Sequence, residues 1–429
     1  MADTGLVSIL PLLVVCRLFS AIFCVAYTFP FCPLAGWFDD WWRLGFVSYG
    51  SRGTGKKIEH EGWSAWSLRP PPHYQSMIGI SALFYALTGI HKPWVMLFYN
   101  SFLHASSGLM LLYFLYRLGN SKKISLIFSI AFVAFPTSLT WVSQIHKDGL
   151  YIFGMYATFL ALSLAFSKAL HHNLLAILLS FSSGFAFYLA GRKYALEIIF
   201  YFYAFFLLVT FSLVIWNLIK KYREEFIFSL RGFVVILTIF FYFNLTQTQT
   251  QTQTQMLWHW NPYVLDKIEH GFYAIAYWRN KVWSKYLAGN MGAIEEEVKF
   301  HSVSDFIAYT PRALFVGFFS PFPMFWFTEG STTGGTIARY ITPFEAVYLY
   351  IAWLFLPIAI WIHRRKPWVW FLLIMCVGFV CFHVVAEPNL GPILRKRYGY
   401  VMLLSALSYS MLLTEIGKRW KKHKVCYNG

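Results

Sequence analysis

The chain has 429 residues, of which 58% are apolar and 21% aromatic, whereas only 13% are charged, about half the charged share of an ordinary soluble domain. A folded soluble protein could not cover so apolar a chain with polar surface, so this composition excludes a soluble enzyme. Lys and Arg outnumber Asp and Glu by 36 to 19, a formal net charge of +17. In a membrane protein this excess is typical of loops at anionic headgroups rather than of nucleic-acid binding.

Long apolar stretches predict an all-α polytopic membrane protein. A helix of about 20 residues crosses a hydrocarbon layer of about 30 Å, and about ten stretches of this chain reach or approach that length. The predicted spans are 6–30, 93–116, 124–141, 150–167, 173–190, 194–216, 231–245, 344–362, 368–386 and 399–415.

Two further apolar segments are predicted not to cross. Residues 76–90 are too short for a comfortable span and follow a run of prolines, which favours a helix lying in the membrane interface. Residues 311–327 contain Pro311, Pro321 and Pro323, which interrupt the backbone hydrogen-bond ladder. Because unpaired backbone groups are not tolerated facing lipid, this segment is predicted to be re-entrant or buried against other helices.

The basic loops predict the orientation, because Lys and Arg concentrate in cytoplasmic loops. With these spans, one side of the membrane receives the basic stretches 117–123, 168–172, 220–231, 363–366 and 418–424. This side is predicted to be the cytoplasm and to hold both termini, in a multi-pass protein of a bacterial inner (plasma) membrane. The other side receives the polar segments 31–75, 142–149, 246–343 and 387–398.

The predicted topology divides the chain into three parts. They are an N-terminal transmembrane catalytic module, 1–245, with the outer loop 31–75 and the interfacial helix 76–90; a long non-cytoplasmic loop region, 246–343, with the re-entrant segment 311–327; and the C-terminal transmembrane helices with a basic cytoplasmic tail, 344–429. The Thr-Gln repeat at 246–255 is a low-complexity tract to which we assign no function.

Three acids on the outer side are candidates for chemistry. Asp39 and Asp40 follow the first predicted span and are flanked by aromatic residues. Carboxylates in such surroundings are costly unless they are paired or bind a ligand, and they could take a proton from a hydroxyl or hold a divalent cation. A solvated loop with interfacial Trp anchors is an equally good interpretation. Asp148, next to Lys147, joins this site if it faces Asp39, and otherwise forms only a local ion pair.

Outer cations form the second group of candidates. Arg395, Lys396 and Arg397 run against the usual bias of positive charge toward the cytoplasm, and a bound phosphate would explain them, with headgroup contact as the alternative. His73 and Tyr74 follow a proline-rich turn at the expected headgroup level, where they could meet a sugar or a phosphate, although an ordinary turn is also consistent with them.

The order of these motifs along the chain resembles that of the GT-C superfamily of membrane glycosyltransferases, which use polyprenyl-phosphate-linked sugars. The shared features are an acid after the first span at Asp39–Asp40, the turn RPPPHY at 69–74, an interfacial helix, and a second acid at Asp148. Later segments, 309–323 and 389–397, are similar to segments of bacterial family-39-like enzymes and polysaccharide-assembly proteins. The turn departs from the more usual two prolines and an aliphatic residue before Tyr.

The resemblance implies a GT-C-like fold and a role for each motif. Asp39 or Asp40 would be the base that activates the acceptor hydroxyl, Asp148 would be a second catalytic acid, and Arg395 and Arg397 would bind the carrier phosphate. Asp39 and Asp148 would hold Mg²⁺ or Mn²⁺ if a metal takes part, and no other cofactor is expected. The substrate-binding residues would be Arg69, His73, Tyr74, Lys147, Glu387, Arg395, Lys396 and Arg397.

The sequence therefore predicts transfer of a hexosyl or pentosyl group from a polyprenyl-phosphate-linked donor to a lipid- or envelope-linked glycan or glycolipid on the non-cytoplasmic face. The protein would bind the polyprenyl-phosphate-linked donor, the glycan or glycolipid acceptor and membrane lipids, and it would not bind nucleic acid. Two alternatives stay open. A polymerase or ligase of lipid-linked polysaccharide would depend on arginines more than on carboxylates. A transporter or flippase would place charged residues inside the spans.

Overall fold

The structure is a computed structural model and its regular elements are helical. It describes residues 46–71, 75–138, 145–167, 169–191, 193–222, 226–227, 229–240, 272–273, 275–277, 279–280, 293–295, 297–329 and 333–427. Within these residues the β-structure amounts to an isolated antiparallel bridge between Ala293 and Asn389.

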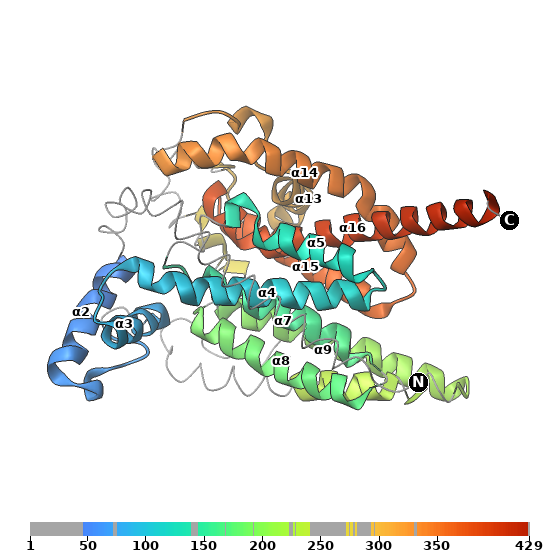
Figure 1. Cartoon of the computed structure of the whole chain (residues 1–429), viewed down its shortest axis with the longest axis horizontal. Helices are drawn as coiled ribbons and strands as arrows, with labels where there is room; N and C mark the ends of the chain where they lie inside the picture. Colours follow the sequence, from blue (N-terminus) through green and yellow to red (C-terminus); the bar gives the residue numbers. More distant parts are fainter. Residues whose placement is uncertain are drawn as a thin grey trace.

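Seven helices in the described part of the chain are long and apolar enough to cross a membrane. They are α4 (Leu97–Arg117) with the preceding turn η2 (Pro93–Met96), α7 (Asp148–Ala165), α8 (Leu170–Leu189), α9 (Lys193–Ile219), α14 (Thr333–His363), α15 (Pro367–Ala386) and α16 (Leu390–Tyr427). The chain is therefore a multi-pass helical membrane protein, with these helices side by side in one bundle (Figure 1).

The number of spans differs from the sequence-based expectation of about ten. The predicted span 6–30 lies outside the described residues. The predicted span 124–141 is not a single helix, because α5 (Lys122–Val133) has 12 residues, which is about 18 Å of helix. Pro136 explains the break, since proline has no N–H to donate and its ring disfavours helical backbone at the residue before it. For the predicted span 231–245, the described helix is a shorter apolar one, Ser229–Phe240.

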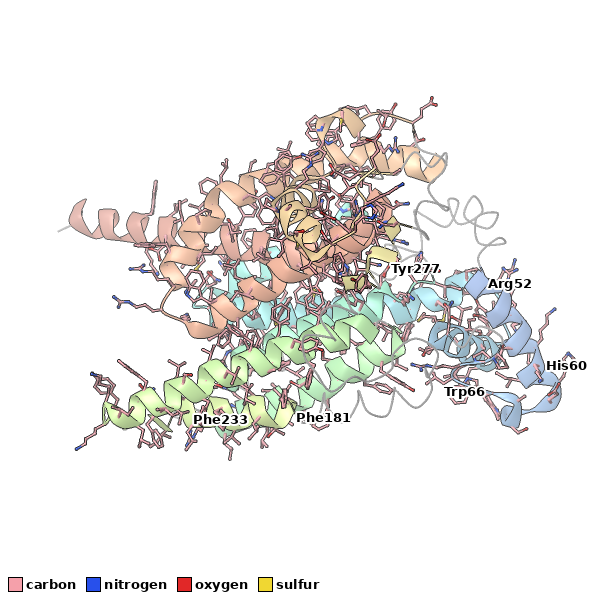
Figure 2. All side chains as sticks on the ribbon, turned by 180° about the vertical axis from the view of Figure 1, so that it is seen from behind. Arg52, His60, Trp66, Phe181, Phe233 and Tyr277 are labelled. Carbon is pink, nitrogen blue, oxygen red and sulfur yellow. The ribbon has the colours of Figure 1, made fainter. Side chains whose placement is uncertain are left out.

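Burial separates central from peripheral helices. In α7, 89% of the apolar window is buried inside the protein, whereas the share is 28% for both α9 and α14. Tyr156 and Phe159 of α7 are almost completely enclosed, while Phe181 of α8 is 43% exposed and points away from the bundle (Figure 2). We infer that α7 lies at the centre and that α8, α9 and α14 carry the lipid-facing surface.

The two ends of the bundle carry different groups. At one end, which we call the basic end, Arg117 of α4 contacts His172 of α8, and Lys366 before α15 reaches the main chain of α4 at Leu118. At the other end, the Asp148 end, α7 and α16 begin and α15 finishes. Long helices joined by a short link, such as α7 with α8 and α14 with α15, run in opposite directions, so described members of the predicted basic loops gather at the basic end.

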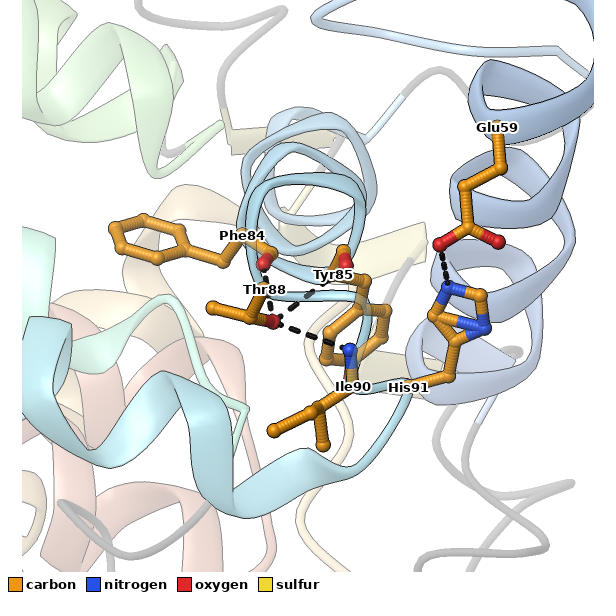
Figure 3. A network of polar contacts seen from close by, with 6 residues as sticks. All are labelled: Glu59, Phe84, Tyr85, Thr88, Ile90 and His91. Carbon is orange, nitrogen blue, oxygen red and sulfur yellow. Dashed lines mark hydrogen bonds and ion pairs between the residues drawn. The ribbon is translucent and has the colours of Figure 1, made fainter.

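Residues 46–88 form a small helical unit at the Asp148 end (Figure 1). It consists of α2 (Phe46–Glu61), η1 (Trp63–Ala65) and α3 (Ser76–Thr88), and α3 corresponds to the predicted interfacial helix 76–90. Beyond α3, His91 Nε2 lies 2.9 Å from Glu59 Oε1 of α2 (Figure 3). Thr88 Oγ1 donates to Phe84 O at 2.7 Å and accepts from the N–H of Ile90, which ties the chain back onto the helix end.

At Gly79, helix α3 packs directly against the main chain of the segment before it. Trp66 Nε1 donates to Gly79 O at 3.0 Å, and a Cβ at position 79 would overlap the main-chain oxygens of Leu68 and Ser67, lying 2.5 Å from the latter. Main-chain atoms cannot move aside as a flexible side chain can. The position therefore requires glycine.

We expect Gly79→Ala to destabilise this unit by about 2–3 kcal/mol, the usual cost of overpacking. Gly53→Ala on α2 is the matched control, because nothing lies within 4 Å of its Cβ and alanine favours an exposed helix by up to about 1 kcal/mol. The measurement is the unfolding temperature in detergent together with protease cleavage at 66–69. Equal behaviour of the two variants would contradict the packing described for Gly79.

The segment predicted to be re-entrant forms α13 (Val303–Phe319) followed by η4 (Pro323–Phe325). Ser302 and Asp305 make a capping box at its start, and the hydrogen bonds from the N–H groups of His301 and Ser302 lower the pKa of Asp305. Pro311 was expected to interrupt this segment, but it lies inside the helix. The helix ends immediately before Ser320 and the cis Ser320–Pro321 bond.

Candidate functional site at the Asp148 end

Part of the predicted site cannot be compared with the structure. Asp39, Asp40, His73 and Tyr74 lie outside the described residues. The predicted base and the predicted metal site, which needs Asp39, therefore stay predictions. In the described part of the chain, no group of three or more His, Cys, Asp or Glu side chains could hold a metal ion.

Asp148 and Arg395, predicted from distant parts of the sequence, lie together. Asp148 is the first residue of α7, where a negative charge is favoured by the helix dipole, and its side chain is only 5% exposed. Arg395, in the second turn of α16, brings its Nε to 3.9 Å from Asp148 Oδ2. Its Nη1 lies 3.2 Å from His146 Nε2. A desolvated carboxylate and a guanidinium thus face each other at one end of the membrane helices.

The three consecutive cations do not converge, which corrects the expectation that Arg395 and Arg397 bind one phosphate together. The sequence suggested a loop at 387–398, but α16 begins at Leu390. Successive residues of a helix point about 100° apart. Arg395 therefore turns to Asp148, Lys396 to Glu387, and Arg397 to the end of α13.

Arg397 is buried, with 2% of its surface exposed. Its Nη1 donates to Gly317 O and its Nη2 to Ser320 O, the main-chain oxygens at the end of α13. The carboxylate of Glu345 on α14 interacts electrostatically with the Arg397 guanidinium. The same carboxylate accepts hydrogen bonds from the N–H and Oγ1 of Thr137. Arg397 is therefore a residue that joins α13, α14 and α16.

Lys396 and Glu387 form a buried ion pair beside Arg395. The Lys396 ammonium donates to Glu387 Oε1, and the two side chains are 7% and 16% exposed. The second oxygen, Glu387 Oε2, is buried and accepts no hydrogen bond from a described residue. A buried acceptor without a donor is costly, so this oxygen is the unsatisfied atom of the pair.

Arg69 has partners within the protein. Its Nε donates to Ser76 Oγ at 3.0 Å and its Nη2 to Tyr188 O at 2.9 Å, and its guanidinium lies 4.1 Å from the centre of the Tyr188 ring. It fixes the start of α3 to the end of α8. Lys147, which precedes α7, is half-buried and donates no side-chain cap to that helix.

Three groups near the site did not belong to the predicted set. His146 contacts Arg395, and its position two residues before Asp148 is the signal that could have found it. His383, in the apolar run of α15, lies 3.0 Å from Tyr151 Oη, which is 2.6 Å from Tyr400 Oη. A histidine inside an apolar span is itself a signal. These hydroxyls join α7, α15 and α16 one turn below Asp148.

Arg279 is the third group, and no motif marks it. It is 3% exposed and donates to the main-chain oxygens of Val384 and Val385 in the last turn of α15, and to those of Glu295 and Val298. Burial lowers the pKa of Arg279. A cation at the carboxyl end of a helix is favoured by its dipole, and here it fastens the segment around 295–298 over the end of α15.

Comparisons with protein-family models, with curated proteins and with solved structures give no match to this chain. What the helices define is a multi-pass helical membrane protein. Any more specific function has to be argued from the groups at the Asp148 end.

Proposed function

We propose that this chain is a membrane glycosyltransferase that moves a sugar from a polyprenyl-phosphate donor to a glycan or glycolipid acceptor. The contact between Asp148 and Arg395, 3.9 Å apart, carries the proposal. The resemblance to GT-C enzymes implies an acid role for Asp148 and a phosphate role for Arg395. A carboxylate and a guanidinium side by side suit a reaction in which a hydroxyl loses its proton while a phosphate leaves.

In the proposed reaction the acceptor oxygen bonds to the anomeric carbon, and the bond from that carbon to the phosphate oxygen breaks with inversion. The acceptor proton passes to a carboxylate, Asp39 or Asp40, with Asp148 as the second acid. Polyprenyl phosphate leaves with the electron pair, and Arg395 donates hydrogen bonds to its oxygens. A divalent cation would be held by Asp39 and Asp148.

Specificity for the sugar would come from the ion pair of Glu387 with Lys396. Glu387 Oε2 is buried without a donor from the described residues, so a sugar hydroxyl would complete its hydrogen bonding. Lys396 holds the other oxygen and fixes the carboxylate in place. Because Arg397 donates to main-chain oxygens of α13, we assign the phosphate role in this proposal to Arg395.

Reconstituted vesicles test this function. The purified chain is supplied with undecaprenyl phosphates that carry labelled hexoses or pentoses, and with acceptor lipids extracted from a bacterial envelope. We expect labelled sugar on an acceptor lipid together with release of undecaprenyl phosphate. A ladder of lengthening lipid-linked products would instead support the polymerase alternative. Passage of intact donor across the vesicle membrane, without release of undecaprenyl phosphate, would support the transporter.

A further inference from the structure

Positive charge at the basic end is gathered in one place, where α4, α8 and α15 meet. Arg117 is the last residue of α4, and its Nη1 lies 3.1 Å from His172 Nδ1 in the first turn of α8. Lys366 immediately precedes α15, and its Nζ lies 3.4 Å from Leu118 O, the residue after Arg117. The rings of Phe114 and Trp368, 5.5 Å apart, pack the start of α15 against α4.

These two cations contact a histidine ring nitrogen and main-chain oxygens. Arg117 Nη2 donates to Ser163 O at 3.4 Å, and its Nη1 faces a ring nitrogen of His172. The same nitrogen of His172 lies 2.7 Å from Ser167 Oγ, and its Nε2 lies 3.1 Å from Tyr113 Oη. Glu415 of α16 accepts from Lys418 Nζ at 2.6 Å and so has a cation of its own.

Two half-buried cations beside each other, without an ion pair to a carboxylate of the described residues, are unfavourable. Burial and the charge of Arg117 both lower the pKa of Lys366. Buried charges in proteins are paired or bind an oppositely charged ligand. An anion between Arg117 and Lys366 would offset the repulsion between the two positive charges.

Aromatic side chains show that this place lies at the level of lipid headgroups. Trp361 is 65% exposed, and the guanidinium of Arg364 lies 3.9 Å from its ring centre. Trp370 Nε1 donates to Arg364 O at 2.8 Å. Exposed Trp beside Arg is typical of the boundary between hydrocarbon and headgroups, and basic pockets between membrane helices at this depth bind anionic headgroups.

We propose that Arg117 and Lys366 bind the phosphate of an anionic phospholipid headgroup, in a site at the opposite end of the bundle from Asp148. The guanidinium would bind the phosphate through its planar fork and the ammonium as a point charge. This site does not depend on the proposed transferase function.

The test compares two double variants with the same loss of charge. Arg117→Gln/Lys366→Gln removes the site, and Lys122→Gln/Lys123→Gln removes two exposed cations of α5 at the same end. Delipidated protein in uncharged detergent is titrated with phosphatidylglycerol or phosphatidylcholine, and bound lipid is counted by native mass spectrometry. We expect one tightly held phosphatidylglycerol per wild-type chain, and about tenfold weaker binding in the first variant only.

Two further measurements test whether the lost binding reflects the site itself and whether the ligand is a lipid. Arg117→Lys/Lys366→Arg keeps both charges and should keep the bound lipid, which guards against a fold defect in the Gln variant. Inorganic phosphate is titrated in place of lipid, and binding as tight as that of phosphatidylglycerol would assign the site to a free anion and overturn the lipid proposal. If phosphatidylglycerol binding weakened equally in both Gln variants, the effect would come from general surface charge, and this result would also overturn the lipid proposal.

Discussion

Asp148→Asn is expected to lower sugar transfer by about a hundredfold or more, the scale of a lost acid or base, while leaving the protein folded. Asn keeps the size and the acceptor oxygen at the start of α7, and Arg395, whose side chain is 29% exposed, can still be partly hydrated. The loss should therefore fall on the reaction rather than on stability. Initial rates in the vesicle assay, beside the unfolding temperature, measure both.

The matched control for this variant is Glu59→Gln, which removes a carboxylate that is 37% exposed on α2 and paired with His91. It should transfer sugar at the wild-type rate within about twofold, because exposed pairs contribute little. A double-mutant cycle with Arg395→Gln adds a second readout. If the two residues act as a unit, the double variant should lose little more than the worse single variant. Unchanged transfer in Asp148→Asn would refute the role assigned to this pair.

Arg397→Met is expected to have the largest effect on stability, about 3–5 kcal/mol. The side chain is buried, and its loss would leave the oxygens of Gly317 and Ser320 without donors and Glu345 beside no positive charge. Because membrane proteins often unfold irreversibly, unfolding by SDS in mixed micelles is the suitable measurement. Arg397→Lys should recover part of the loss, since it keeps the charge but not the two-pronged geometry.

Arg312→Met supplies the comparison for Arg397. Arg312 lies on α13, the helix whose end Arg397 contacts, but its side chain is 51% exposed and pairs with Glu295 at 2.6 Å. A pair exposed to solvent contributes at most about 1 kcal/mol. A similar loss of stability in both variants would contradict the view that burial, rather than charge alone, makes Arg397 important.

Several features of the fold were predictable from local sequence. Length and apolarity predicted α4, α7, α8, α9, α14, α15 and α16 within a few residues at most ends, because a helix that faces lipid must be long and almost free of charge. The broken span at 124–141 was missed although Pro136 was visible, since a proline interrupts some helices and is accommodated in others, as Pro311 is in α13.

Residue type and position along the chain were enough to single out Asp148, Arg395, Lys396 and Arg397, because ionised groups beside membrane spans are costly and need partners. Which partner each one has depends on how the helices pack. As a helix, α16 turns three adjacent cations toward three different neighbours, and the start of α7 meets only the first of them. The sequence by itself therefore determined seven long membrane helices and the charged candidates. The tertiary structure decided which cation faces the acid, because side-chain direction follows helix geometry and helix packing rather than order in the chain.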